Sequence, residues 1–169
     1  MKLRYTKSKI LGLRIIYPLT NFKDKRGNYV QLFHKKIYND TLNKTFKESD
    51  ISCSKHNVLR GIHGDNKTTK LISCLYGKFF FVVVNNDKKS KNYLKSESFI
   101  LSDQNRIQIE VPPKHGNGHF VLSHYSIFHY MQTNYYDRKS QFTINWKDER
   151  ININWPKSCK KPIISERDS

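Results

Sequence analysis

Residues 70–85 read KLISCLYGKFFFVVVN, two runs rich in apolar and β-branched residues that meet at Gly77. Lys70–Tyr76 and Lys78–Asn85 each have the length of a strand, and the second run is the strongest strand signal in the chain. Gly77 permits a tight turn between them, because glycine adopts backbone conformations that other residues avoid. This stretch therefore predicts a fold built on strands.

Similar runs recur along the chain at spacings of roughly ten residues, with turn signals between them. We predict strands at Lys9–Pro18, Asn28–His34, Asn57–His63, Tyr93–Leu101, Arg106–Val111, His119–Ser123 and Ser126–Thr133. Only Lys35–Lys47 is predicted as a helix. Many short strands at this spacing indicate an all-β sandwich or barrel. The last segment, Trp155–Ser169, lacks periodicity and is expected to lie across the body as a tail.

The composition indicates one domain over residues 1–169, since no repeat or linker divides the chain. Hydrophobic residues make up 37% and aromatic residues 13%, which excludes a disordered chain. The formal net charge is +17, from 31 Lys and Arg against 14 Asp and Glu. Because these basic residues are scattered singly and in pairs, we expect an anionic small-molecule site rather than a nucleic-acid partner.

Cysteine spacing and hydropathy indicate a reduced, cytoplasmic protein without a membrane partner. Cys53, Cys74 and Cys159 are far apart, which suits neither a disulfide framework nor a zinc site. Arg14 interrupts the apolar stretch Ile10–Tyr17, so we expect no signal peptide. The seven histidines include no HxH pair of the kind that binds metal in many small β-barrels, so no metal is expected.

The stretch 58–64, VLRGIHG, holds the first candidates for chemistry. In a regular strand, Arg60 and Ile62 share one face and His63 takes the other. His63 joins Arg60 only if the strand ends or bulges there, which the glycines at 61 and 64 permit. These glycines would also let a ligand approach closely. The alternative is a histidine at a strand end with no chemical role.

Two further candidates lie on predicted strands. Alternation over 127–132 places Phe128, Tyr130 and Gln132 on one face, so Tyr130 is either a core residue or a site residue. Lys70 begins its strand, and a lysine that points into a barrel needs an anionic or ligand partner. Each signal is weak when taken singly.

Taken in order, these motifs resemble the nucleotide-sugar 3,5-epimerase family, typified by dTDP-4-dehydrorhamnose 3,5-epimerase. The resemblance spans nearly the whole chain, and its combination of motifs is specific. The matching stretches are FKDKRG at 22–27, VLRGIH at 58–63, Lys70-Leu71 with Gly77, VPP at 111–113, Tyr130 with Tyr135-Tyr136, WKD at 146–148, INWP at 153–156 and ISERD at 164–168.

Within this family the chain resembles the capsule-type GDP-heptose epimerases in several details. The stretch 55–65, KHNVLRGIHGD, is similar to that subgroup, as are GNGH at 116–119, QFT at 141–143 and SERD at 165–168. The resemblance therefore implies a GDP-4-keto-6-deoxy-heptose epimerase that acts at C-3, C-5 or both, in capsule or surface-polysaccharide precursor synthesis.

The family resemblance also implies a cupin-type jelly-roll barrel with few short helices, a homodimer, and a reaction without cofactor or metal. His63 would be the base that removes a proton beside the C-4 ketone, and Asp168 would orient its imidazole. Lys70 would stabilise the enolate at O-4, and Tyr130 would return a proton to the opposite face.

Substrate contacts follow from the same resemblance. Arg60 and Arg26 would hold the diphosphate, and Tyr29 would stack on the base or sugar. The implied substrate-binding residues are Arg60, Arg26, Tyr29, Gln31, Asn117 and His119.

Four other interpretations of the chain stay open. One is a dTDP-4-keto-6-deoxy-hexose epimerase, against which the Gly64-Asp65 and Asn117/His119 patterns count. A 3,4-ketoisomerase on the same fold and a catalytically silent sugar-binding cupin are the second and third. A nucleic-acid-binding barrel is the fourth, and it would need exposed aromatics along a basic groove.

Overall fold

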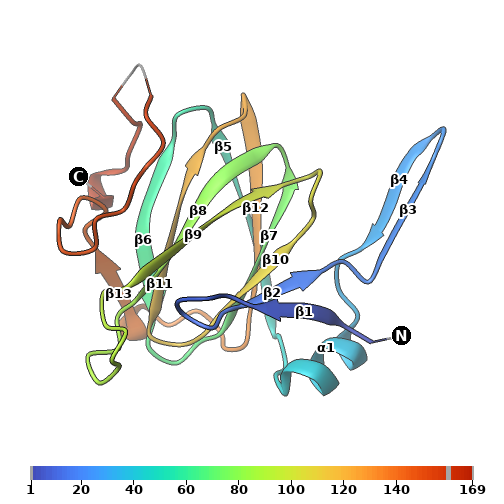
Figure 1. The fold of residues 1–169 in the computed structure, drawn as a ribbon, viewed down its shortest axis with the longest axis horizontal. Helices are drawn as coiled ribbons and strands as arrows, with labels where there is room; N and C mark the ends of the chain where they lie inside the picture. Colours follow the sequence, from blue (N-terminus) through green and yellow to red (C-terminus); the bar gives the residue numbers. More distant parts are fainter. Residues whose placement is uncertain (1, 159–160, 169) are drawn as a thin grey trace.

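The computed structural model describes residues 2–158 and 161–168, and it is almost entirely β-structure (Figure 1). A six-stranded sheet has the order β1-β2-β10-β7-β12-β5, and a five-stranded sheet has the order β13-β6-β11-β8-β9. Every strand pair in these sheets is antiparallel. The predicted all-β, cupin-type jelly-roll class is confirmed.

The strands of the six-stranded sheet are β1 (Arg4–Lys7), β2 (Arg14–Tyr17), β10 (Gln108–Val111), β7 (Lys70–Tyr76), β12 (Tyr125–Gln132) and β5 (Glu48–Lys55). Those of the five-stranded sheet are β13 (Gln141–Ile144), β6 (Leu59–Asp65), β11 (His115–Val121), β8 (Lys78–Asn85) and β9 (Ser96–Ser102). A separate hairpin consists of β3 (Thr20–Asp24) and β4 (Gly27–Gln31). Helical structure in the described residues is limited to α1 (Lys35–Leu42) and the 3-10 turns η1 (Arg138–Ser140) and η2 (Glu166–Asp168).

Gly77 lies at a corner where the chain passes from one sheet to the other. Strands β7 and β8 have the predicted bounds, but they belong to different sheets and do not pair. Gly77 has a φ of +75°, and a Cβ there would lie 2.1 Å from the carbonyl oxygen of Tyr125. Only glycine fits this corner.

The core fills the space between the two sheets. Its largest cluster comes from strands of both sheets and comprises Leu13, Ile72, Cys74, Phe79, Phe81, Val83, Leu101, Ile109, Val111 and Phe128. Phe79 and Phe81 are fully buried. The run that dominates the sequence is therefore the centre of the core, as its hydrophobicity predicts.

Two predicted elements are shorter than expected. The predicted strand Lys9–Pro18 is reduced to β2, because Gly12 has a φ of +68° and Ser8 Oγ accepts a hydrogen bond from the Leu13 amide, which forms a turn. The predicted helix Lys35–Lys47 ends at Leu42, because Asn43 adopts a left-handed conformation.

The sequence patterns missed four strands, β1, β3, β5 and β13, and shifted the ends of several others. Strand β5 has the sequence ESDISCSK and few apolar residues, and it is held by its pairing with β12 along its whole length. Polar strands of this kind carry little hydrophobic signal.

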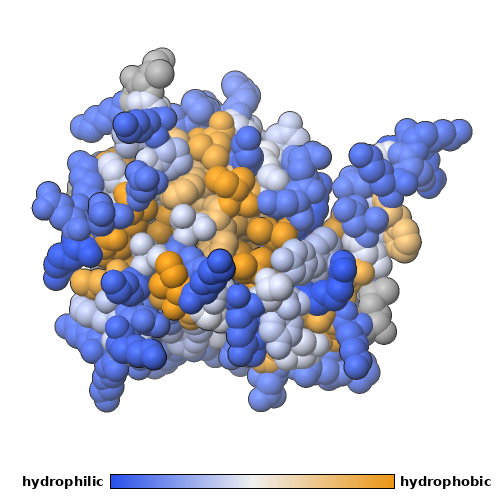
Figure 2. Space-filling view, viewed as in Figure 1, coloured by the Kyte–Doolittle hydropathy of each residue, from blue (hydrophilic) through white to orange (hydrophobic). Residues whose placement is uncertain are grey.

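The β3–β4 hairpin projects from the body as an arm (Figure 1). Figure 2 shows mainly hydrophilic residues over this arm, whereas hydrophobic residues gather near the centre of the same face, over the barrel. Two aromatic side chains of the arm are nevertheless exposed, Phe22 to 67% and Tyr29 to 64%.

The C-terminal segment crosses the body as predicted for 155–169, within the residues described there. Ile163 forms a parallel bridge with Val58, and the Leu59 amide donates to the Ile163 carbonyl oxygen at 2.9 Å. Cys159 lies outside the described residues. None of the helices in the described part of the chain is long and apolar enough to cross a membrane.

Candidate functional site

A cavity of about 560 Å³ opens between the two sheets and beneath the C-terminal segment. This volume is in the range that holds a small-molecule ligand. Seven of the predicted site residues line it: Arg60, His63, Lys70, Asn117, His119, Tyr130 and Asp168. These seven residues, which come from both sheets and from the end of the chain, therefore lie around one cavity.

A bulge in β6 brings Arg60 and His63 to the same cavity. His119 of β11 pairs with Arg60 and Asn117 with His63, so three steps along β6 face two along β11. Ile62, between them, is fully buried in a separate apolar cluster. Of the two conditions stated for this stretch, a strand end or a bulge, the structure shows the bulge, since alternation alone would have put His63 on the face opposite to Arg60.

Asp168 forms a dyad with His63. The His63 Nε2 donates to Asp168 Oδ1 at 2.6 Å, and Asp168 Oδ2 accepts from the Gly61 amide at 3.0 Å and from Ser165 Oγ at 2.9 Å. The Asp168 carbonyl oxygen also accepts from Trp146 Nε1 at 2.9 Å. A carboxylate only accepts, so it holds the proton on Nε2 and leaves Nδ1 as the basic nitrogen of the ring.

The two glycines of this strand also leave room for side chains from distant parts of the chain. A Cβ at Gly61 would lie 2.6 Å from Asp168 Oδ1, and a Cβ at Gly64 would lie 2.1 Å from Cζ of Phe142. The space that a side chain would need at these positions is occupied by the Asp168 carboxylate and the Phe142 ring. Both neighbours are far away in sequence, so local pattern did not indicate them.

The charge state of the dyad suits a base. Burial lowers the pKa of His63, and the nearby Arg167 and Lys70 charges lower it further, while Asp168 opposes them. Burial raises the pKa of Asp168, but hydrogen bonds from Gly61 and His63 outweigh it and hold that pKa below its ordinary value. Near neutral pH the pair is therefore a neutral imidazole and an ionised carboxylate.

The six-stranded sheet supplies the opposite wall of the cavity. Tyr130 lies on β12 with Phe128 and Gln132 on the same face, as alternation predicts. Burial and the Asp50 carboxylate raise the pKa of Tyr130 to about 12, so its phenol is protonated at neutral pH. Tyr130 is thus a proton donor placed across the cavity from His63.

Lys70 lies beside Tyr130 at the start of β7. Its Nζ is 5.6 Å from the centre of the Tyr130 ring, and within the described residues it has no carboxylate in ion-pair contact. Burial lowers the pKa of Lys70, which the Asp65 charge opposes. A half-buried cation without an ion-pair partner is available to a negatively charged ligand atom.

His119 and Asn117 are packed differently. His119 is 3% exposed and stacks on Phe128 with ring centres 4.4 Å apart, and burial lowers its pKa to about 3. Its Nε2 and the Oδ1 of Asn117 are buried without hydrogen-bond partners among the residues described. Buried polar atoms are seldom left unpaired, so these two mark the cavity wall as a place where a ligand group would find partners.

Three predicted contacts lie outside this cavity. Arg26, Tyr29 and Gln31 belong to the arm, where Arg26 forms an ion pair with Asp24 at 2.6 Å. Arg26 and Tyr29 line a smaller hollow of the arm itself. Within one chain, these residues are not brought together with His63.

The cavity residues that were not among the predicted sites include Gln132, Gln141 and Arg167. Gln132 shares a face with Tyr130, so alternation alone could have found it. Arg167 directly precedes Asp168, and Gln141 begins β13, a strand that the sequence patterns missed. For Gln141 no local signal was available, since β13 is defined by its pairing with β6.

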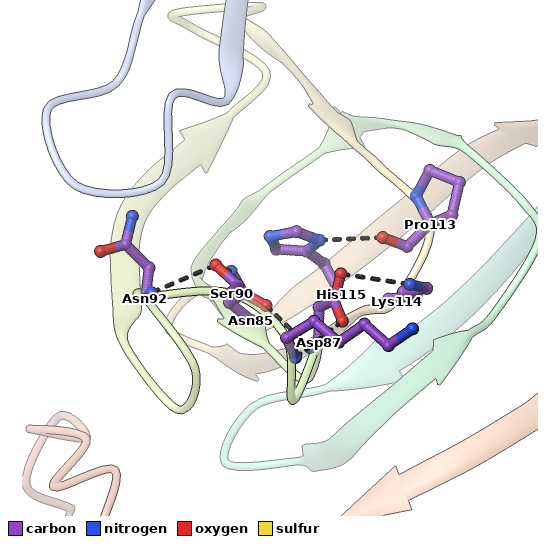
Figure 3. Close-up of polar contacts among 8 residues, drawn as sticks. Asn85, Asp87, Ser90, Asn92, Pro113, Lys114 and His115 are labelled. Carbon is purple, nitrogen blue, oxygen red and sulfur yellow. Dashed lines mark hydrogen bonds and ion pairs between the residues drawn. The ribbon is translucent and has the colours of Figure 1, made fainter.

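His115 lies near one end of the barrel in a separate polar cluster (Figure 3). Its Nδ1 is 3.0 Å from the Pro113 carbonyl oxygen, and Lys114 Nζ lies 3.1 Å from Asp87 Oδ2. The Asp87 amide in turn donates to Asn85 Oδ1 at 2.8 Å. These contacts anchor the loop after β8, and in the described part of the chain no group of three or more His, Cys, Asp or Glu is placed to bind a metal.

The chain is similar to known proteins over nearly its whole length. The sequence profile of the dTDP-4-dehydrorhamnose 3,5-epimerase family matches residues 7–169. The chain is 34% identical to dTDP-4-dehydrorhamnose 3,5-epimerase of Salmonella typhimurium, over 96% of this chain and 91% of that protein. It is 35% identical to the Escherichia coli enzyme of the same name, over 96% and 89%.

A solved structure supports the same relationship. The dTDP-6-deoxy-D-glucose-3,5-epimerase of Legionella pneumophila, determined in complex with dTDP-4-keto-L-rhamnose, superposes with a TM-score of 0.91. The two chains are 31% identical, and the match covers 98% of this chain and 89% of that one. The chain therefore belongs to the dTDP-4-dehydrorhamnose 3,5-epimerase family and is a nucleotide-sugar epimerase.

Proposed function

We propose that this protein epimerises a dTDP-linked 4-keto-6-deoxy hexose at C-3, C-5 or both. The observation that carries the proposal is the division of the cavity: His63, bonded to Asp168 of the C-terminal segment, lies on one sheet and Tyr130 lies on the other. Inversion requires that a proton leave one face of the sugar and return to the opposite face. A base and an acid on facing walls meet this requirement.

The base step begins at His63 Nδ1. The C-4 ketone acidifies the protons on C-3 and C-5, and a neutral imidazole removes one of them. The Asp168 carboxylate stabilises the imidazolium that forms, because it accepts from Nε2 and stays ionised. Gly61 holds the second carboxylate oxygen, so the dyad keeps its geometry while the charge changes.

Lys70 and Tyr130 complete the reaction. Removing the proton leaves an enolate with negative charge on O-4. The Lys70 ammonium lies in the cavity beside Tyr130, has no ion-pair partner among the described residues, and is the cation that we assign to O-4. Tyr130 then donates its phenolic proton to the opposite face of the carbon. Its raised pKa keeps that proton in place until the enolate forms.

We also propose that the protein works as a homodimer in which the arm of one copy completes the cavity of the other. Arg60 lines the cavity, whereas Arg26, Tyr29 and Gln31 lie on the arm. They would contact the same ligand as Arg60 only if the arm comes from a second copy. An arginine pair suits a diphosphate, and the exposed Tyr29 ring suits stacking on a base or sugar.

The GDP-linked 4-keto-6-deoxy heptose is the second candidate substrate. The names of the relatives above refer to dTDP sugars, so the dTDP-linked hexose is the first candidate substrate. The unpaired Asn117 Oδ1 and His119 Nε2 favour a sugar with more hydroxyl groups, which would satisfy them.

Proton NMR in D2O tests the reaction directly. The protein is mixed with dTDP-4-keto-6-deoxy-glucose or with GDP-4-keto-6-deoxy-heptose, and deuterium is followed at C-3 and C-5. Exchange on the dTDP sugar is the expected result, and the carbons that exchange show whether C-3, C-5 or both lose a proton. Exchange on the GDP sugar alone would select the heptose. No exchange on either would contradict both and favour a silent sugar-binding protein.

Subunit complementation tests the arm. When they are assayed apart, we expect a His63→Asn protein to be nearly inactive, and an Arg26→Ala/Tyr29→Ala protein to be nearly inactive at a substrate concentration well below its raised KM. If arms act between copies, refolding them together creates mixed dimers with one complete site, about a quarter of all sites for random pairing. Activity that stays at the sum of the two separate proteins would rule out a shared site.

A further inference from the structure

Asp65 is a buried carboxylate that the proposed reaction leaves unused. It is 3% exposed, at the end of β6 beyond His63. Its Oδ1 accepts from the amides of Lys67 and Thr68 at 2.7 and 2.9 Å. Its Oδ2 accepts from Ser140 Oγ at 2.6 Å and from Gln141 Nε2 at 2.5 Å. Because every partner is a donor, the group is bound as an ionised carboxylate.

This network determines which way the Gln141 amide faces. Asp65 accepts only, so the Gln141 NH2 group must point toward it and the Oε1 atom must point away. Gln141 lines the cavity, and no hydrogen bond to its Oε1 comes from the described residues. Strand pairing adds rigidity, since Gln141 lies opposite Asp65 in the β13–β6 ladder.

We propose that Gln141 is a specificity-determining residue whose Oε1 accepts a hydrogen bond from a sugar hydroxyl, and that Asp65 is the positioning residue that orients it. The inference rests on the proposed function for the identity of the sugar. An acceptor would repel the enolate oxygen and the diphosphate and suits a hydrogen-bond donor instead; in the sugar that donor is a hydroxyl group. The cavity would then recognise the sugar through Gln141 Oε1, whose orientation is determined by Asp65, a residue that does not line the cavity.

Three substitutions test the polarity of this contact. Gln141→Met keeps the length of the side chain but removes the acceptor. Asp65→Asn keeps an acceptor for the Lys67 and Thr68 amides but presents an NH2 group to Gln141, which must then rotate and show its own NH2 to the sugar. The double variant Asp65→Asn/Gln141→Glu restores an acceptor, because the carboxylate introduced in β13 accepts from the amide introduced in β6 and keeps a second oxygen for the cavity.

The readout is binding, measured by calorimetry with dTDP-glucose and with dTDP, and in parallel with GDP-mannose and GDP. For each pair, the Kd of the bare nucleotide divided by the Kd of the nucleotide sugar gives the contribution of the sugar to binding. We expect Gln141→Met and Asp65→Asn each to reduce this ratio by about tenfold. The double variant should recover most of the loss, and the affinity for the bare nucleotide should not change.

A matched control separates orientation from folding. Ser140→Ala removes another donor to Asp65 but leaves the Gln141 contact, so it should lower the melting temperature without changing the sugar ratio. If Asp65→Asn does not fold, Gln141→Met alone still decides the matter.

The possible results separate this inference from the proposed reaction. A wild-type ratio in Gln141→Met overturns the inference, as does a double variant no better than Asp65→Asn. A wild-type protein that binds the sugar nucleotides no more tightly than the bare nucleotides overturns it too. Failure of the reaction appears instead as absent deuterium exchange in the wild-type protein, which leaves the binding ratios to decide the role of Gln141.

Discussion

The cavity and the arm are two regions with candidate site residues, and they differ in what holds those residues in place. In the cavity, His63 and Asp168 are fixed by hydrogen bonds to each other and to backbone amides. On the arm, the Arg26 guanidinium contacts only Asp24, two residues away, among the described residues, and Tyr29 is 64% exposed. One chain by itself therefore completes the chemistry of the cavity, whereas the arm lacks a partner.

The largest effect is expected at the centre of the cavity. His63→Asn should abolish deuterium exchange at both carbons, with a loss of about 10³-fold or more, because no other base replaces it. Tyr130→Phe should impair net inversion more than proton removal, since exchange through the His63 face remains. Both are measured by NMR in D2O, with the exposed His56→Asn as a control. Equal and complete loss of exchange in the two variants would contradict this division of roles.

The support of the dyad is the next test. Gly61→Ala places a Cβ only 2.6 Å from the present position of Asp168 Oδ1, so the carboxylate must move. We expect kcat to fall by about 10²-fold with little change in KM, since misplacement of a catalytic group by an ångström costs that much. The NMR shifts of the His63 ring protons report the lost contact. Unchanged shifts together with full activity would show that the carboxylate is not needed.

A smaller and different effect is expected on the arm. Arg26→Ala should raise KM by roughly tenfold, because one charge-assisted contact to the diphosphate is lost, while kcat and the melting temperature stay near wild type. Lys91→Ala removes an equal charge from an exposed loop and should leave KM unchanged. If both variants raise KM alike, the arm contributes only general charge.

The smallest effect is a shift in pH dependence. The base acts when His63 is neutral, so activity falls as the pH drops through its pKa, which burial places below the ordinary histidine value. Arg167→Gln removes a charge that lowers this pKa, so the acid limb of kcat/KM should move to higher pH. Asp168→Asn removes the opposing influence and should move it to lower pH. Shifts in the reverse directions would mean that another group limits the rate.

Much of the fold was predictable because its signals are local. The bounds of β7 and β8 follow from their continuous apolar runs, and the alternation over 127–132 places Tyr130 and Gln132 in the cavity. The glycines beside Arg60 and His63 indicated that the strand could end or bulge there, and it bulges. In contrast, β5 and β13 are polar, and their pairing with distant strands is what makes them strands.

The amino-acid sequence by itself determined the all-β class, the core strands and the residue types available for proton transfer, because periodicity and side-chain chemistry need only near neighbours. The tertiary structure alone decided what fills the space beside Gly61 and Gly64, which way Gln141 faces, and that the arm lies apart from the cavity. His63 and Asp168 are 105 residues apart in the chain, and their hydrogen bond exists only because the C-terminal segment pairs with Val58 and returns to β6. Contacts over such distances depend on the packing of the whole chain, which no local pattern records.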